Sequence, residues 1–191
     1  MNVGQRYHRL GQESAAFVDA LICAAARRGA GGWSLTCVAA VLERRGEMKA
    51  LTLWQPWASL VATGDKGFET RSWQTKYRGK LAIHASVNFP KWAKELCGEQ
   101  VFAEALFGPG INKYHSSLHL PLGAIVTICN LVDCIPITEQ FAASLTEQER
   151  AFGDYRLGRF AWELKDVIIL PAFIPAKGRQ GLWNWEPPEG V

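Results

Sequence analysis

Apolar and polar residues alternate with a period of two along several short segments that follow Met48. In KLAIHAS, residues 80–86, Leu81 and Ile83 fall on one side of an extended chain and Ala82 and His84 on the other. This spacing is typical of a β-strand, because successive side chains of a strand point to opposite faces. Gly and Pro residues separate these segments, so the pattern predicts short strands joined by turns and short helices.

The same criteria predict the order of the elements. Helices are expected at 55–64 and 90–107, and Ser144 with Glu147 forms a capping box for a further helix that ends near Gly153. Strands are expected at 49–54, 68–73, 80–86, 123–137 (one long strand or a bent pair), 159–170 and 181–186, with 171–180 separating the last two. Short strands interspersed with short helices predict an α+β fold, a small mixed β-barrel of five or six strands with flanking helices, and argue against a doubly wound sheet.

Residues 1–47 differ in composition from the rest of the chain. They contain six Arg and no Lys, and Met48 then opens MKALTLWQPW, which has the character of a chain start. Three interpretations remain open: upstream sequence translated from a start assigned too early, a secretory signal or organelle presequence, whose apolar run Asp19 interrupts, or two short helices at about 14–28 and 35–45. The predicted organisation is an N-terminal extension (1–47), one domain (48–186) and a tail (187–191).

Composition limits the classes of function. The 191 residues include 48% hydrophobic residues and eight Trp, enough for a core, and the net charge of +3 is too small for a strongly cationic coat. Five scattered Cys without a C-x-x-C pair favour a reducing compartment, so we expect a cytoplasmic protein. No apolar run approaches the roughly 18 to 20 residues of a membrane span. His115 and His119 lie in a loop-like segment without an acidic or Cys neighbour, so neither a metal nor a cofactor is expected.

The segment GDKGFETRSW, residues 64–73, gathers three charges at the start of a predicted strand. In an extended chain Glu69, Arg71 and Trp73 share one face, Phe68 can face the core, and Lys66 lies in the preceding turn. An amine, a carboxylate and a guanidinium that converge at a barrel mouth could bind a phosphate or a base. The alternative is a solvated ion pair between Glu69 and Arg71, worth about 0 to 1 kcal/mol.

A local surplus of cations follows. Residues 65–80 hold five cationic side chains against two acidic ones, five minus two, or +3. The cations of this stretch are Lys66, Arg71, Lys76, Arg78 and Lys80. Such a patch attracts a phosphate backbone, and nearby aromatic residues can stack on unpaired bases.

Several side chains are candidates for ligand contact beside this patch. Trp57, with Gln55 at the entry to a short helix, is the preferred exposed aromatic, and Trp73 is a second candidate. His84 lies beside the proposed cleft and either contacts the ligand or bonds to the backbone. Trp183 is expected in the core.

Residues 48–186 resemble the ASCH domain family of the PUA-like superfamily. The family signature G-x-K-x-x-E-x-R stands intact as Gly64, Lys66, Glu69 and Arg71, and YRGKLAIHAS, GAIVTICNLVDCIPIT and GRFAWELKDVIILPAFIPAKGRQGLWNWE resemble the strands that follow. The resemblance implies a PUA-like β-barrel in which the signature lines a cleft for RNA or a nucleotide-like ligand. It does not cover residues 1–47.

The resemblance also implies alternatives. Some similar proteins are ribonucleases or a small amidohydrolase with a Lys, Thr and Glu set; Lys66 matches the Lys, but Glu69 stands where that enzyme has Thr. The main prediction is an RNA- or nucleotide-binding module. The first alternative is a hydrolase of RNA or modified nucleosides with Lys66 and Glu69 as catalytic residues, and the second is a protein-interaction module that uses the helix at 90–107 or the residues before Met48.

Overall fold

The computed structural model describes residues 48–108 and 120–188. The predicted helices at 14–28 and 35–45, and His115 and His119, lie outside the described residues. In chain order the elements are β1 (Met48–Leu53), α3 (Trp57–Ala62), β2 (Phe68–Arg71), β3 (Gly79–Ala85), α4 (Lys91–Leu96), α5 (Gln100–Phe107), β4 (Ala124–Pro136), α6 (Glu139–Ser144), α7 (Glu147–Ala151), β5 (Phe160–Pro175) and β6 (Leu182–Trp185).

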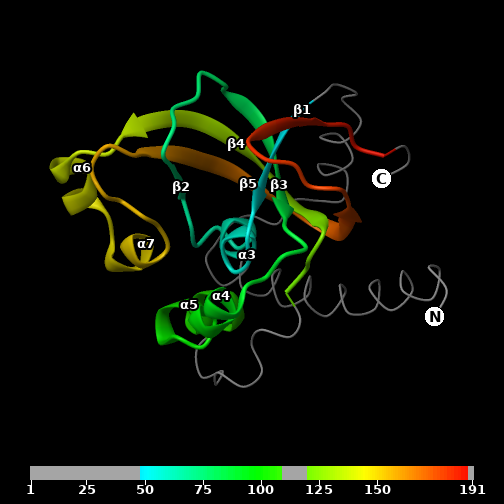
Figure 1. Cartoon of the computed structure of the whole chain (residues 1–191), viewed down its shortest axis with the longest axis horizontal. Helices are drawn as coiled ribbons and strands as arrows, with labels where there is room; N and C mark the ends of the chain where they lie inside the picture. Colours follow the sequence, from blue (N-terminus) through cyan, green and yellow to red (C-terminus); the bar gives the residue numbers. More distant parts are fainter. Residues whose placement is uncertain (1–47, 109–119, 189–191) are drawn as a thin grey trace.

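The six strands form one mixed sheet in the order β2-β5-β4-β3-β1-β6. β1 and β3 are parallel, and the other neighbouring strands are antiparallel. The long pair β4 and β5 shifts register at three places, and such irregularities increase the bend and twist of a sheet. The sheet therefore curls around α3 as a half-barrel (Figure 1), which confirms the predicted α+β fold with a small six-stranded barrel.

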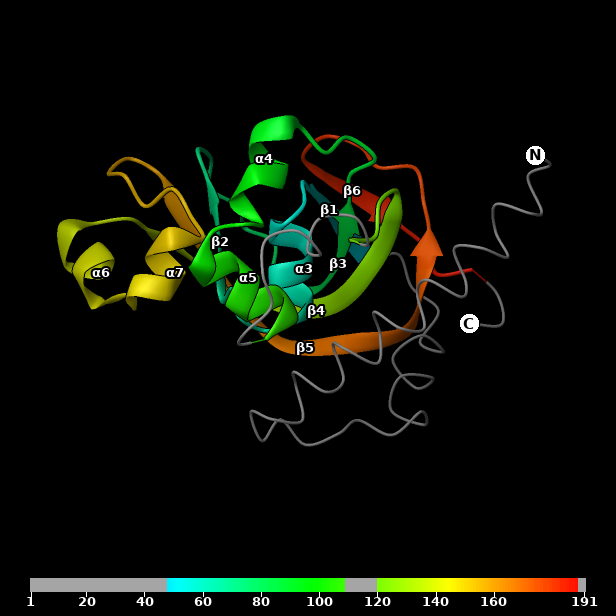
Figure 2. The ribbon, with the colours of Figure 1, turned by 90° about the horizontal axis from the view of Figure 1, so that it is seen from below.

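Both faces of the central strands are buried, each in a core of its own. One face of the sheet, with Leu51 and Ile83, packs around α3 and Trp162 inside the curve. The opposite face, with Ala50 and Ala82, forms a second core under Trp183, which is buried as expected. Figure 2 shows α3 beside β3, β4 and β5, with α4 and α5 on its other side. In the described part of the chain, no helix combines the length and apolar character of a membrane span.

Three predicted boundaries are wrong. The single helix expected at 90–107 is two helices, α4 and α5, because the chain turns at Gly98 and becomes extended at Glu99 before the second begins. The capping box Ser144/Glu147 does not form; the helix α7 is capped by Thr146, whose side chain accepts from the N–H of Glu149, and α6 was not predicted.

The third boundary concerns the predicted separator 171–180. β5 continues through its first half to Pro175, because Ile174 and Pro175 pair with the first residues of β4. Pairing along the neighbouring strand thus outweighs the local preference of Pro for turns.

Candidate functional site

The turn between α3 and β2 positions the signature residues. The N–H groups of Asp65 and Lys66 both donate to the carbonyl of Leu60, at 3.0 and 3.1 Å, and so satisfy the end of the helix. Gly64 adopts a positive φ of 76°, which glycine tolerates without strain. The turn directs the Lys66 side chain inward, where it is only 1% exposed.

β2 then brings the carboxylate to the inner face of the sheet. Glu69 pairs in register with the fully buried Trp162 and is itself 8% exposed. Phe68 points the other way and packs against Phe141 of α6, with ring centroids 5.4 Å apart. The expectation that Phe68 faces the core of the barrel is therefore wrong. The charged residue occupies the inward position because two cations accompany it.

The three signature charges meet. Oε1 of Glu69 lies 3.1 Å from Nε of Arg71, and Oε2 lies 3.9 Å from Nζ of Lys66. The Lys66 amine donates its hydrogen bond to the carbonyl oxygen of Phe152 at 2.7 Å. Lys66 is therefore bonded to the end of α7. Of the two cations, Arg71 is the one that reaches the surface, with 25% of its side chain exposed.

A second carboxylate completes the cluster from α7. Glu149 accepts from the N–H of Gly67 at 2.7 Å and from the hydroxyl of Tyr155 at 2.5 Å. It also lies 3.4 Å from the N–H of Phe68. These contacts fasten α7 to the start of β2, and with Glu149 the buried cluster holds two cations and two anions.

Burial perturbs the titration of this cluster. Desolvation lowers the pKa of the Lys66 amine, Glu69 and Glu149 oppose that shift, and the Arg71 charge adds to it. Desolvation also raises the pKa of Tyr155, and its hydrogen bond to the Glu149 carboxylate raises it further. Both groups are thus shifted toward their neutral forms by the low polarity of their surroundings.

Arg71 spans the open side of the half-barrel. Its Nη2 lies 3.4 Å from the carbonyl oxygen of Thr52, near the end of β1. Among the strands that the structure describes, β2 is one edge of the sheet and pairs with β5, whereas β1 lies four places away in the strand order. The guanidinium therefore connects two strands that the curvature of the sheet brings together.

The predicted aromatic and amide candidates differ in their exposure to solvent. Gln55 is fully buried: its amide donates to the Pro121 carbonyl at 2.8 Å and its Oε1 accepts from the Ser59 N–H at 3.1 Å. Trp57 is half-buried, so the expectation that it is the preferred exposed aromatic is wrong. Trp73 is 37% exposed and packs edge-on against Trp162.

More exposed aromatics lie nearby. Trp54 is 44% exposed and Trp92 is 49% exposed, and Trp92 was not selected from the sequence as a candidate for ligand contact. In the sequence Trp92 lies within an amphipathic helix, where an aromatic residue ordinarily packs inward. α4 instead buries Ala93, and Trp92 stays largely exposed.

The remaining predicted residues lie outside the cluster. Lys76 is exposed, and Arg78 forms an exposed ion pair with Asp133 at 2.9 Å. His84 is 1% exposed, and its Nε2 lies 3.0 Å from the carbonyl oxygen of Ala176. His84 thus has the backbone bond that was one of its two interpretations, and its contact with a ligand stays a prediction.

Two residues of the cluster were missed from the sequence, Glu149 and Tyr155. They follow the signature by about 80 residues, so no local spacing connects them to it. One signal was available: Thr146 and Glu149 have the Thr-x-x-Glu spacing of a capping box. Here Thr146 caps the helix, but the Glu149 side chain turns away to Gly67.

The fold and this charge cluster define a class of protein: a small α+β half-barrel of the PUA-like kind, with a Lys-Glu-Arg cluster at the turn into its second strand. Comparison with known families identifies the ASCH domain over residues 51–172. The chain belongs to the ASCH domain family.

Two relatives extend this assignment. The chain is 33% identical over 140 residues to Activating signal cointegrator 1 of Homo sapiens and to the protein of the same name of Mus musculus. The alignment covers 70% of this chain and 22% of each relative. The chain thus corresponds to one part of those longer proteins.

Proposed function

We propose that this protein binds RNA or a nucleotide-like ligand through the surface at which Arg71 emerges from the buried cluster. The observation that carries the proposal is the position of the guanidinium, which Glu69 and the Thr52 carbonyl hold at the open side of the half-barrel. A fixed guanidinium binds phosphate oxygens or a base edge with little loss of conformational entropy. Membership of the ASCH domain family supports the same ligand class.

Neighbouring charges support an anionic ligand. Lys76 and Arg78 are exposed on the segment between β2 and β3, directly after Arg71 in the chain. Lys66, by contrast, is 1% exposed and bonded to Phe152, so we assign it the role of holding the cluster together. Arg71 is then the member of the signature that touches the ligand, with Glu69 as its positioning residue.

Binding is tested by fluorescence anisotropy with labelled RNA oligomers, and by competition with mononucleotides, at several salt concentrations. Arg71→Ala is expected to weaken binding roughly 5- to 150-fold, the equivalent of about 1 to 3 kcal/mol, and to lower the salt dependence by about one phosphate contact. Arg156→Ala is the matched control, because that side chain is 81% exposed and paired with Asp154 outside the cluster. Equal affinities of wild type, Arg71→Ala and Arg156→Ala would contradict the proposal.

A hydrolase acting on RNA or modified nucleosides is the second candidate. One observation favours it: burial lowers the pKa of Lys66, and an amine shifted toward neutrality can serve as a base or nucleophile. Incubation of the protein with RNA oligomers and modified nucleosides, followed by mass spectrometry, detects any product. Retention of the RNA without product supports the binding module, and product that disappears in a folded Lys66→Met variant supports the hydrolase.

A further inference from the structure

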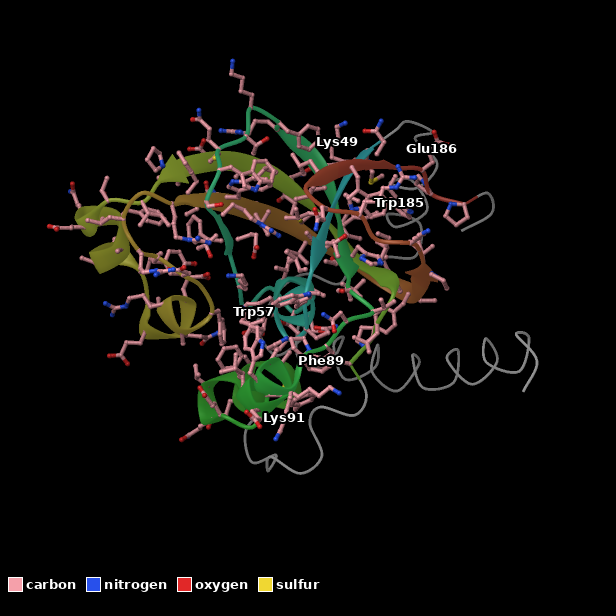
Figure 3. The ribbon with its side chains drawn as sticks, in the orientation of Figure 1. Lys49, Trp57, Phe89, Lys91, Trp185 and Glu186 are labelled. Carbon is pink, nitrogen blue, oxygen red and sulfur yellow. The ribbon has the colours of Figure 1, made fainter. Side chains whose placement is uncertain are left out.

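Three tryptophans form a patch where β1, α3 and α4 meet. The tryptophan patch consists of Trp54, in the connection after β1, Trp57, the first residue of α3, and Trp92 in α4. The ring centroid of Trp92 lies 5.6 Å from that of Trp54 and 5.7 Å from that of Trp57, with interplanar angles of 69° and 50°. Figure 3 shows Trp57 and Phe89 at the junction of the two helices and Lys91 on the outer side of α4.

Packing of the helices accounts for only part of this patch. Trp57 contacts the core between the helices and is half-buried, as expected of a residue that joins α3 to α4. Trp54 and Trp92 leave 44% and 49% of their surfaces exposed although they touch each other. Adjacent exposed aromatic side chains are one of the features from which an interaction site can be inferred.

The charges around the patch specify the kind of ligand. Lys91 precedes Trp92 with 92% of its side chain exposed, and Lys94 follows on the same helix with its Nζ 5.5 Å above the Phe89 ring. Glu95 is the nearby carboxylate of the helix, and it lies 3.8 Å from Lys91. Flat aromatic faces with cations beside them are the arrangement with which proteins bind unpaired bases and their phosphates.

A short stretch of chain connects the patch to the residue that Arg71 contacts. The Arg71 guanidinium contacts the carbonyl of Thr52, and Trp54 follows two residues later. At about 3.3 Å per residue of extended chain, the backbones of Thr52 and Trp54 are roughly 7 Å apart, a distance that a few nucleotides of one strand can span. One strand can therefore place a phosphate at Arg71 and a base against Trp54 or Trp92.

We propose that the tryptophan patch is a base-stacking site that makes this protein a binder of single-stranded nucleic acid in preference to a duplex or a lone nucleotide. The inference rests on the proposed function, because it extends the Arg71 surface along one strand. A duplex keeps its bases stacked on one another and offers none to the tryptophans. A mononucleotide occupies the Arg71 surface alone.

The test compares oligomers that differ only in their bases. Anisotropy is measured with an eight-nucleotide single-stranded RNA, an abasic oligomer of the same length, a blunt duplex, and single-stranded DNA of the same base sequence. Trp92→Ala is expected to weaken binding of the two base-bearing single strands roughly 5- to 150-fold, as a lost stacking contact of about 1 to 3 kcal/mol. It is expected to leave the abasic oligomer and the salt dependence unchanged, because no phosphate contact is lost.

Further variants separate stacking from other effects. Trp92→Tyr retains an aromatic face and is expected to restore most of the affinity. Leu157→Ala, at a residue that is 58% exposed and follows α7, removes a comparable exposed apolar side chain and is expected to change nothing. Irradiation of RNA that carries 5-iodouridine is expected to link the base to Trp54 or Trp92, which peptide mass spectrometry locates.

The outcomes distinguish this inference from the proposed function. If Trp92→Ala binds every oligomer like wild type while Arg71→Ala is weakened, the tryptophan patch is not a stacking site and the proposed function stands. If wild type binds neither oligomers nor nucleotides, both are wrong. If wild type does not bind nucleic acid but binds a protein, and Trp92→Ala abolishes that binding, the patch is a protein interface and the inference is overturned.

Discussion

Replacement of Lys66 by Met tests whether this residue stabilises the fold. The Lys66 amine is 1% exposed and donates to the carbonyl oxygen of Phe152 at 2.7 Å, in a part of the chain where Phe152 is itself fully buried. Methionine is similar in length and fills the same space without a donor. The variant therefore removes the charge and the hydrogen bond while it leaves little cavity.

The expected magnitude follows from the groups left behind. An unsatisfied buried carbonyl costs about 1 to 3 kcal/mol, and loss of a hydrogen bond from a charged donor falls in a similar range. Glu69 keeps its contact with Arg71 at 3.1 Å, so the full cost of about 3 to 5 kcal/mol for an unpaired buried charge does not apply. Recovery of the desolvation penalty of the amine offsets part of the loss. We expect a decrease in the free energy of unfolding of about 2 to 4 kcal/mol.

Chemical denaturation with urea measures this change, and thermal unfolding provides a second readout. A loss of about 3 kcal/mol corresponds to a decrease in Tm of roughly 6 to 12 °C for a chain of this size. Lys165→Met is the matched control, because the side chains of its ion pair with Glu163 are 58% and 24% exposed, and an exposed pair contributes little to stability. If the two variants are equally stable, Lys66 does not hold α7 against β2 and the reasoning is refuted.

Two further predictions concern titratable groups. Tyr155→Phe removes the 2.5 Å hydrogen bond to Glu149 and is expected to lower the free energy of unfolding by about 1.5 to 3 kcal/mol in urea denaturation. Burial raises the pKa of Tyr155 in the folded state, so the unfolded chain loses the phenolic proton first as the pH rises. Wild type therefore becomes less stable above about pH 10, and Tyr155→Phe should lack this loss of stability at high pH. Desolvation lowers the pKa of His84, so the unfolded chain binds the proton first as the pH falls below about 6.5, and stability decreases toward pH 5. His84→Gln should make that decrease shallower, by at most about 1.4 kcal/mol per pH unit, and an unchanged slope between pH 7 and 5 would contradict the assignment.

The sequence predicts the strands well because the signals it uses are local: alternating positions of an extended chain face opposite sides, and Gly and Pro separate one strand from the next. Both faces of β3 are buried, so the alternation around His84 predicts the strand but not which of its faces is solvated. The break between α4 and α5 was missed because the apolar positions on the two sides of Gly98 fit one helix. The residue itself was a visible signal, since glycine lowers helix stability by about 1 kcal/mol relative to Ala.

The site is only half predictable for a different reason. Alternation in β2 correctly places Glu69 and Arg71 on one face, but it does not say whether that face is solvated or buried. Burial of Glu69 depends on Trp162 across the sheet, and the partner of Lys66 is a backbone carbonyl at Phe152. Contacts between segments this far apart follow from the topology of the sheet, which single-sequence periodicity does not determine.

The geometry explains why the signature needs its particular spacing. Glu69 and Arg71 are two residues apart in β2, so both project from the same face and the carboxylate can hold the guanidinium. Lys66 precedes the strand by two residues, in a turn that Gly64 permits, and this lets its amine approach the same carboxylate while it bonds to the end of α7. A shift of Glu69 or Arg71 by one position would turn its side chain to the other face of the sheet. The spacing thus fixes one cation in the interior and leaves the other at the surface, which is why we expect substitutions of Lys66 to affect stability and those of Arg71 to affect binding.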